Sequence, residues 1–493
     1  MDDSFFGDRP GASHHRALSI TAEFAPLIKV GGLADVAGTL PSYLGKQGWD
    51  TRTLMPLYPQ LDALAGNWPI VHREDLVLCG AAVVRMGEHA GNTLLLLDAP
   101  QLFGELAAPY QAMTGDWAEV ARRFAALSEM GACLAAAGLQ DGWRPDVVHA
   151  HDWHAALATH LIKLRNIPVG TALTLHNASF QGILTYDDAH RIGLPQSWLT
   201  KEADHYGHTS FLKAGIQTAD VVTTVSPNYA RELLQPETGM AMDGYLRARG
   251  ARFRGILNGI DVAAPRRRSV NAHLAHKRRM RAELCAEFNL RSDGPLAVIV
   301  SRLTAQKGLD IVMDVWSALD ECDSSLILVG TGDSAIEDGF RSIRRKHPNR
   351  VGLCLAYSSE LAARLFTGGD CILIPSRFEP CGLTQMYAME QGTIPIATAV
   401  GGLADTIIDA TPAALKAKAA TGILLPGAEP RHLSRALHHM CALHAQPAVW
   451  RQMQINAMRM DFSWDEAAAD YAAVYRQARE LYPSRGGGSD FAR

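Results

Sequence analysis

The sequence lacks the features of several large protein classes. No run of about 18 apolar residues occurs, and the first 16 residues lack the apolar stretch of a signal peptide, so we expect neither a membrane span nor secretion. The eight cysteines form no CxxC pair, which argues against structural zinc and fits a reducing compartment. A net charge of −4 gives no concentrated basic surface for nucleic acid. These absences predict a cytoplasmic globular protein.

Two nucleotide-binding motifs are also missing. The chain contains neither GxGxxG nor GxxxxGK[ST], so the sequence indicates neither a dinucleotide fingerprint nor a Walker loop. With 47% hydrophobic and 20% charged residues, however, the chain can form sizeable cores. Its function must therefore be sought in less common motifs.

Short apolar runs alternate along the chain with longer stretches of helical periodicity. The runs predict strands at 17–22, 51–56, 146–150, 169–176, 220–225, 296–301, 325–330, 351–356, 370–376 and 393–398. We expect each to be followed by 10 to 20 helical residues. Apolar strands separated by helices indicate parallel sheets covered on both faces, so the predicted fold is α/β with two doubly wound, Rossmann-like domains.

The alternation breaks once, between Asp261 and Pro295, and this break sets the predicted domain boundaries. We expect a disordered leader (1–16), an N-terminal domain (17–261), a linker or hinge (262–294), a C-terminal domain (295–462), a helix that packs back on the N-terminal domain (463–482) and a disordered tail (483–493). The linker includes a charged helix around Lys277 to Glu287. Its arginine triplet, 266–268, is typical of solvated linker surface, with an anion site as the alternative. Ligands bind at the carboxyl ends of strands in such sheets, so we expect the domains to face a cleft.

Polar and glycine residues follow the first predicted strands. Gly31 and Gly32 allow a close backbone approach before a helix that begins near Leu33, and Lys29 precedes them, where a cation and a helix N-terminus suit phosphate. The alternative is an ordinary turn. The sequence HAHDWH (149–154) is close to a metallo-β-lactamase pattern, but its aspartate falls one position early. We therefore favour Asp152 as a site-lining residue over a metal site.

His176 and Asn177 come directly after another apolar run. The carboxyl end of a strand is where polar groups meet ligands, although His176 could equally be a structural cap. The following Ser-Phe-Gln-Gly forms a polar loop with an aromatic residue suited to sugar.

The second half has two further motifs. Arg302 and Lys307 flank a loop that leads into a helix, where two cations suit a diphosphate leaving group; a solvated surface pair is the alternative. The segment PSRFEPCGLTQ (375–385) places Glu379 after a buried strand, and we expect Gly382 to begin a helix whose N–H groups face the same site. A carboxylate there can bind sugar hydroxyls or a developing cation, and a helix N-terminus can bind phosphate.

Together these motifs resemble the bacterial glycogen synthase and plant starch synthase family. KVGGLADV, HAHDWH, HNASFQG, SRLTAQKGLD, PSRFEPCGLTQ and GGLADT occur in the family's order and spacing, and MRMDFSWDEAAADY matches its C-terminal end. The resemblance covers about 17–482. It departs at 262–268, which replaces the family's usual segment after LNGID, and in the leader before Ala17.

The resemblance implies a GT-B fold, ADP-glucose as donor, and transfer of glucose to the non-reducing end of an α-1,4-glucan, glycogen, with retained configuration. The implied donor-binding residues are Lys29, Gly32, Asn177, Arg302, Lys307, Gly382, Leu383 and Thr384. Glu379 is implied to hold glucose or stabilise positive charge at its anomeric carbon, and His176 and Asp152 to line the glucose pocket.

No cofactor or metal is expected. Many transferases of the other main fold hold a divalent ion with Asp-x-Asp, and no two aspartates here lie two positions apart. Lys29, Arg302 and Lys307 would then supply the positive charge. The alternatives are a related transferase with another donor or acceptor, and a catalytically idle glucan-binding protein. The presence of Glu379, Arg302 and Lys307 argues against the second.

Overall fold

The computed structural model describes residues 15–106, 108–111, 116–261, 269–356 and 358–482, which form two compact units. The first unit contains the chain up to Thr224, Leu233–Ile256 and the chain from Trp464 onward. The second contains Val225–Glu232 and Leu257–Ser463. The predicted disordered tail (483–493), the arginine triplet (266–268) and all but the last two residues of the predicted leader (1–16) lie outside the described residues.

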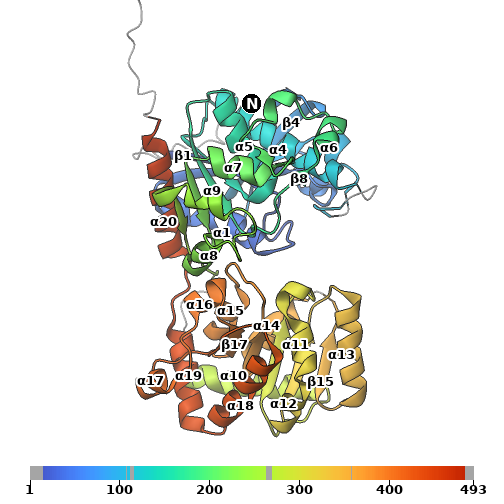
Figure 1. The fold of residues 1–493 in the computed structure, drawn as a ribbon, viewed down its shortest axis with the longest axis vertical. Coiled ribbons are helices and arrows are strands. Elements are labelled where there is room, and N and C mark those ends of the chain that lie inside the picture. The colour runs from blue at the N-terminus through green and yellow to red at the C-terminus, as the bar shows by residue number, and fades with distance from the viewer. Residues whose placement is uncertain (1–14, 107, 112–115, 262–268, 357, 483–493) are drawn as a thin grey trace, which may run out of the picture. The chain divides into compact units, whose positions relative to one another are not determined.

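Figure 1 draws the first unit in blue to green, with α20 in red. The unit is built on a nine-stranded sheet in the order β12-β11-β7-β6-β1-β2-β5-β4-β3. Its strands are β1 (His15–Ile20), β2 (Trp49–Pro56), β3 (Ile70–Leu76), β4 (Gly80–His89), β5 (Asn92–Asp98), β6 (Val147–His151), β7 (Gly170–Leu175), β11 (Val221–Thr224) and β12 (Phe253–Gly255). All pair in parallel except β4, which is antiparallel to both of its neighbours. A small antiparallel sheet, β8 (Ile183–Leu184), β10 (His208–Ser210) and β9 (Asp204–His205), lies in the same unit.

The strands β3 to β5 correct one prediction. The sequence predicts helix after the second strand, but this region forms two short helical turns and then an antiparallel meander. Ala90 and Gly91 join β4 to β5 with φ of 49° and 77°, and positive φ at both turn residues suits a two-residue hairpin. The apolar run LLLL of β5 is buried between β2 and β4 and belongs to the sheet rather than to a helix.

Helices cover both faces of this sheet. They are α1 (Gly32–Lys46), α2 (Asp62–Ala65), α3 (Pro100–Phe103), α4 (Trp117–Ala137), α5 (Asp152–Leu164), α6 (Tyr186–Arg191), α7 (Phe211–Thr218), α9 (Asp243–Arg247) and α20 (Trp464–Glu480). α5 packs against both α4 and α7, and α1 packs against α20. Successive residues of β1 point to opposite faces of the sheet. Ala17 packs into the cluster formed with α1 and α20 on one face, whereas Ile20 approaches α4 on the other.

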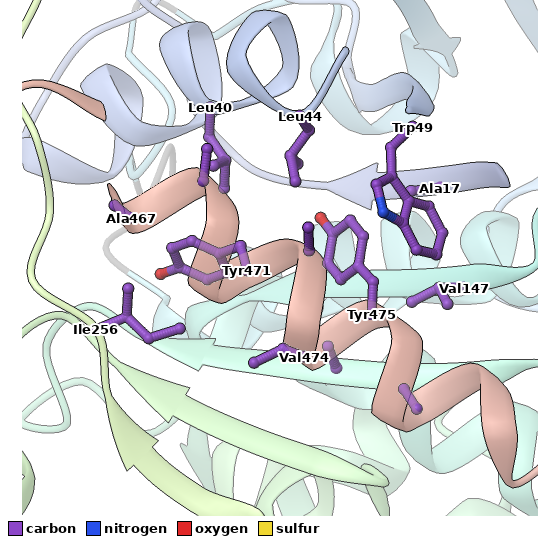
Figure 2. Close-up of a cluster of buried hydrophobic side chains, with 14 of the residues drawn as sticks. Ala17, Leu40, Leu44, Trp49, Val147, Ile256, Ala467, Tyr471, Val474 and Tyr475 are labelled. Atoms are coloured by element: carbon purple, nitrogen blue, oxygen red, sulfur yellow. The ribbon is translucent and has the colours of Figure 1, made fainter. Parts of the chain in front are cut away.

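The last helix, α20, fills the core of the first unit. Tyr471 and Tyr475 are fully buried beside Trp49 and Leu40 in a cluster that extends from α1 across the central strands (Figure 2). The ring of Tyr475 meets Trp49 edge-on at 4.9 Å, and its hydroxyl lies 2.8 Å from His149 Nδ1. The sequence places this helix back on the N-terminal domain, and the structure counts it with the first unit.

The second unit has a six-stranded, fully parallel sheet in the order β15-β14-β13-β16-β17-β18. The strands are β13 (Leu296–Val300), β14 (Ser325–Val329), β15 (Val351–Cys354), β16 (Cys371–Ile374), β17 (Ile394–Thr398) and β18 (Ile423–Leu425). The helices around it are α10 (Val270–Glu287), α11 (Leu309–Asp314), α12 (Trp316–Glu321), α13 (Ser334–Lys346), α14 (Ser359–Gly368), α15 (Thr384–Glu390), α16 (Gly401–Thr406), α17 (Pro412–Lys416), α18 (Pro430–His444) and α19 (Pro447–Arg459), with most of α8 (Pro227–Leu233). The predicted α/β class with two doubly wound domains is confirmed.

Helix α10 is part of the second unit, although the sequence assigns its residues to the linker. Lys277 is only 4% exposed, and its ammonium donates to the carbonyls of Thr367 and Gly369 and to the hydroxyl of Thr393. Burial lowers its pKa to about 8. The charge of this helix therefore does not mark it as a solvated connection. None of the described helices is long and apolar enough to span a membrane.

We predict that the first unit depends on α20 for its stability. Tyr475→Ala should lower the free energy of unfolding by about 3–5 kcal/mol, as expected for a large aromatic core truncation. Tyr475→Phe, which removes only the hydroxyl, should cost about 1–2 kcal/mol. Urea denaturation followed by circular dichroism measures both. Arg476→Ala, on the exposed side of the same helix, is the control and should change stability by less than about 0.5 kcal/mol. An equal effect of all three substitutions would contradict the prediction.

Candidate active site

Glu379 lies in the loop between β16 and α15 and is 6% exposed. Its Oε2 atom accepts hydrogen bonds from Lys307 Nζ at 2.6 Å and from Ser376 Oγ at 3.0 Å. Its backbone carbonyl accepts from the Gly402 N–H at 3.2 Å. Hydrogen bonds thus fix both the side chain and the backbone of Glu379. The ammonium of Lys307 compensates the carboxylate for the hydration that it loses on burial.

The two predicted cations of the second unit, Lys307 and Arg302, differ in their surroundings. Lys307 ends a short 3₁₀ turn after β13 and is paired with Glu379. Arg302, earlier in the same loop, is exposed. The sequence predicts both as cations for a diphosphate but does not predict the ion pair.

The helix after Glu379 begins later than predicted. α15 starts at Thr384 with Leu383 as its N-cap, and no side chain caps its first N–H groups. Gly382 precedes it with φ of +70°, and a Cβ atom there would lie 2.6 Å from Gln385 Oε1 and 3.1 Å from Glu379 Cγ. Position 382 thus requires glycine as the turn beside the carboxylate rather than as the first helical residue.

The KVGG loop of the first unit is folded around an acidic residue that the sequence analysis missed. Glu23, 3% exposed, accepts at Oε2 from the N–H groups of Val30 (2.7 Å) and Gly31 (2.9 Å), and at Oε1 from the Tyr110 hydroxyl. Lys29 is ion-paired with Asp35 at 2.7 Å, a contact that the sequence did not predict. α1 begins at Gly32, and no side chain caps its N-terminus. Glu23 lies three positions after the end of β1, and an acidic residue at a strand end is a signal that could have identified it. No comparable signal in the sequence marks Tyr110.

Three histidines of the first unit are buried in a hydrogen-bonded cluster. His151 lies 2.9 Å from His176 and 3.2 Å from Ser19 Oγ, and His149 contacts Tyr475 (2.8 Å) and Thr174 (2.6 Å). Burial lowers the pKa of His151 to about 3; burial and then neighbouring imidazoles lower those of His149 and His176 well below 6.5. These imidazoles are therefore neutral near pH 7. Among the residues that the structure describes, no group of three His, Cys, Asp or Glu side chains is arranged to hold a metal ion.

Asp152 joins the ends of two neighbouring strands. It follows β6 with φ of +56°, and its Oδ1 accepts from the N–H groups of His176 (2.6 Å) and Asn177 (3.3 Å) after β7. Burial raises its pKa to about 7, against the effect of these two hydrogen bonds. Asn177 in turn accepts from the backbone and hydroxyl of Ser179, which shapes the following loop. The three predicted residues of this region, Asp152, His176 and Asn177, do lie together.

Comparisons with known proteins assign the family. A family model described as the starch synthase catalytic domain matches residues 16–248, and one described as glycosyl transferases group 1 matches residues 280–453. The chain is 45% identical over 469 residues to a glycogen synthase of Cereibacter sphaeroides, covering 94% of this chain and 98% of that protein. It is 44% identical over 466 residues to the glycogen synthase of Paracoccus denitrificans, covering 93% and 98%. The chain belongs to the glycogen synthase family.

Solved structures support the same family and the GT-B fold. The catalytic domain of starch synthase IV from Arabidopsis thaliana, bound to ADP and acarbose, matches with a TM-score of 0.82 and 26% identity, covering 95% of this chain and 100% of that one. Sucrose-phosphate synthase from Thermosynechococcus elongatus shares the fold, with a TM-score of 0.59 and 19% identity over 95% of this chain. The chain is therefore a glycosyltransferase of the glycogen and starch synthase type, as its motifs predict.

We predict that buried neutral histidines make the fold sensitive to acid. His154, which stacks on Tyr110 with ring centroids 4.9 Å apart, has its pKa lowered to about 3 by burial. Between its usual pKa of 6.5 and about 3, the unfolded chain binds a proton that the folded chain does not, so stability is lost as pH falls through 6.5. Each such residue contributes a slope of up to about 1.4 kcal/mol per pH unit.

His154→Phe removes one of these titrations while keeping an aromatic ring. Urea unfolding at pH 7, 6 and 5 should therefore show a shallower loss of stability for this variant, by up to about 1.4 kcal/mol per pH unit. The exposed His190→Phe is the control and should leave the slope unchanged. Identical slopes in His154→Phe and wild type would show that the pKa of His154 is not lowered in the folded state.

Proposed function

We propose that this chain transfers glucose from ADP-glucose to the non-reducing end of an α-1,4-glucan such as glycogen, with retention of configuration. The observation that carries the proposal is the ion pair between Lys307 and the buried Glu379. Glu379 lies in the PSRFEPCGLTQ motif of a chain that belongs to the glycogen synthase family. A protein that only bound glucan would not need a buried carboxylate, which is costly to desolvate. The solved relative with ADP and acarbose supports the same classes of donor and acceptor.

The ion pair suits a reaction in which charge separates. As the bond to the anomeric carbon breaks, negative charge grows on the departing ADP and positive charge on the glucosyl group. A fixed ammonium stabilises the negative charge and a fixed carboxylate the positive charge, and neither group has to reorganise during the reaction. We assign Lys307 and the exposed Arg302 to the diphosphate, and Glu379 to the glucosyl group. The backbone at Gly382, Leu383 and Thr384 precedes or begins an uncapped helix and would contact phosphate and sugar.

The residues of the first unit have a different role in this proposal. His176 is neutral, so it would act on the glucosyl group by hydrogen bonding rather than by charge. Asp152 holds the backbone of His176 and Asn177, and it would line the glucose pocket. Lys29 and Gly32 would contact the donor; for Lys29 this requires that it exchange Asp35 for a phosphate. No metal ion enters the reaction.

The donor is tested by incubating the purified protein with glycogen and a panel of nucleotide glucoses in the presence of EDTA. We expect ADP-glucose to extend glycogen faster than UDP-glucose at equal low concentrations, measured as incorporation of labelled glucose. Faster transfer from UDP-glucose would refute the proposed donor. Activity that is lost in EDTA and restored by zinc, manganese or magnesium would refute the metal-independent mechanism.

The role of Glu379 is tested with Glu379→Gln, which keeps the size of the side chain and removes its charge. We expect folded protein that binds ADP, with kcat lower by about 100-fold or more, because preorganised charge at the reacting centre is lost. Glu360→Gln, an exposed substitution in α14 of the same unit, is the control and should keep wild-type kcat. A near wild-type kcat for Glu379→Gln would mean that the carboxylate acts only as a hydrogen-bond acceptor.

A further inference from the structure

A short segment of the chain, Val225–Glu232, is counted with the second unit, although the residues on both sides of it are counted with the first. Two of its hydrogen bonds reach the loop after β16 and helix α16. Ser226 Oγ donates to the Pro380 carbonyl at 2.6 Å, and the Asn228 N–H donates to Asp405 Oδ2 at 2.7 Å. The segment thus contacts the residue directly after Glu379.

Glu232, in α8, makes a third hydrogen bond to this region. Its Oε1 accepts from the N–H of Gly401 at 2.8 Å, and the side-chain amide of Asn228 donates to the same oxygen at 2.7 Å. Gly401 is buried and its N–H begins α16, where no side chain of the helix itself serves as a cap. Burial raises the pKa of Glu232, while the hydrogen bonds from Gly401 and Asn228 oppose that shift. Asp405, also with a raised pKa, and Arg231 are the charged groups nearby.

The turn that Glu232 holds lies against the backbone of Glu379. Gly401 has φ of +43°, and a Cβ atom there would be 1.9 Å from the Glu379 carbonyl oxygen. The next residue, Gly402, donates its N–H to the same carbonyl at 3.2 Å. A displacement of the Gly401–Gly402 turn would therefore also displace the backbone of Glu379, which the turn contacts.

We infer that Glu232 is a positioning residue for Glu379, acting through the Gly401–Gly402 turn. Lys307 and Ser376 orient the Glu379 carboxylate, and Glu232 fixes the turn on which its backbone rests. This inference rests on the proposed function, which places Glu379 at the reacting centre. Because misplacement of a reacting group by about 1 Å can lower a rate about 100-fold, loss of Glu232 should slow transfer without removing a group that touches substrate.

Two substitutions separate positioning from general stability. Glu232→Ala removes the acceptor, and we expect kcat lower by about tenfold or more with KM for ADP-glucose within about threefold of wild type. Glu232→Gln retains an oxygen that can accept from Gly401 and Asn228, so we expect kcat within about threefold of wild type. Glu237→Ala, exposed and close in sequence, is the control and should match wild type.

Hydrogen exchange gives a readout that does not depend on transfer. In Glu232→Ala, the backbone amides of 376–384 and of Gly401 and Gly402 should exchange faster than in wild type, and in Glu232→Gln they should not. If wild type failed to use ADP-glucose, the proposed function would fall, while the exchange data would still test the contact. Wild-type kcat and exchange in Glu232→Ala would overturn the inference, as would a Glu232→Gln variant as slow as Glu232→Ala.

If Glu232→Ala does not fold, a second variant tests whether Glu232 positions Glu379. Asn228→Ala removes the amide that orients Glu232 but leaves the carboxylate and the Asn228 backbone bond to Asp405. We expect a kcat about threefold to tenfold lower than wild type, with KM nearly unchanged. Wild-type kcat in Asn228→Ala would then overturn the inference.

Discussion

Parallel strands all end at the same edge of their sheet, and the chemistry of this protein depends on that constraint. In the first unit, the ends of β1, β6 and β7 bring Glu23, Asp152 and His176 to one edge. In the second, the ends of β13, β16 and β17 do the same for Lys307, Glu379 and Gly401. Neighbouring strands in these sheets come from distant parts of the chain, so residues 72 positions apart, such as Lys307 and Glu379, can form one ion pair.

The loops at these edges contain buried charges that depend on specific partners. A carboxylate taken out of water is stable only if hydrogen bonds or a cation replace the lost hydration. Glu379 has an ammonium and a hydroxyl, whereas Asp152 has two backbone N–H groups. The buried histidines avoid the cost of burying a charge, because burial lowers their pKa values and they remain neutral. The reactive arrangement is therefore a set of coupled contacts rather than a group of independent side chains.

The sequence predicted β1, β2, β6, β7 and β11 of the first sheet and β13 to β17 of the second. Runs of Val, Ile and Leu bounded by polar residues reflect strands buried on both faces. It also identified Glu379, Asp152 and His176 as strand-end residues, and Lys307 as a cation beside a loop that leads into a helix. It could not predict that Lys307 pairs with Glu379 or that Lys29 pairs with Asp35, since both are tertiary contacts made by flexible side chains. Their roles toward substrate remain predictions.

Three differences between the sequence predictions and the structure have physical causes. The charge of α10 suggested a linker, but the long alkyl chain of Lys277 allows its ammonium to reach buried carbonyls, so a charged residue can belong to the interior. The strands β3 to β5 were missed because the prediction expected a helix after each strand, whereas these three antiparallel strands follow one another with only short connections. The role of Glu23 was missed because the backbone N–H groups of Val30 and Gly31, which it accepts from, reach it only when the KVGG loop folds back on it.

The position of α20 in the chain also has a consequence for biosynthesis. Its tyrosines belong to the core of the first unit, yet they are made only after the entire second unit has been translated. Until then, Trp49 and Leu40 in the nascent chain lack the surface that covers them in the native protein. The second unit, which ends at Ser463, can acquire its own core earlier. Synthesis on the ribosome thus imposes an order in which the unit made first is completed last, with exposed apolar surface that chaperones can bind in the interval.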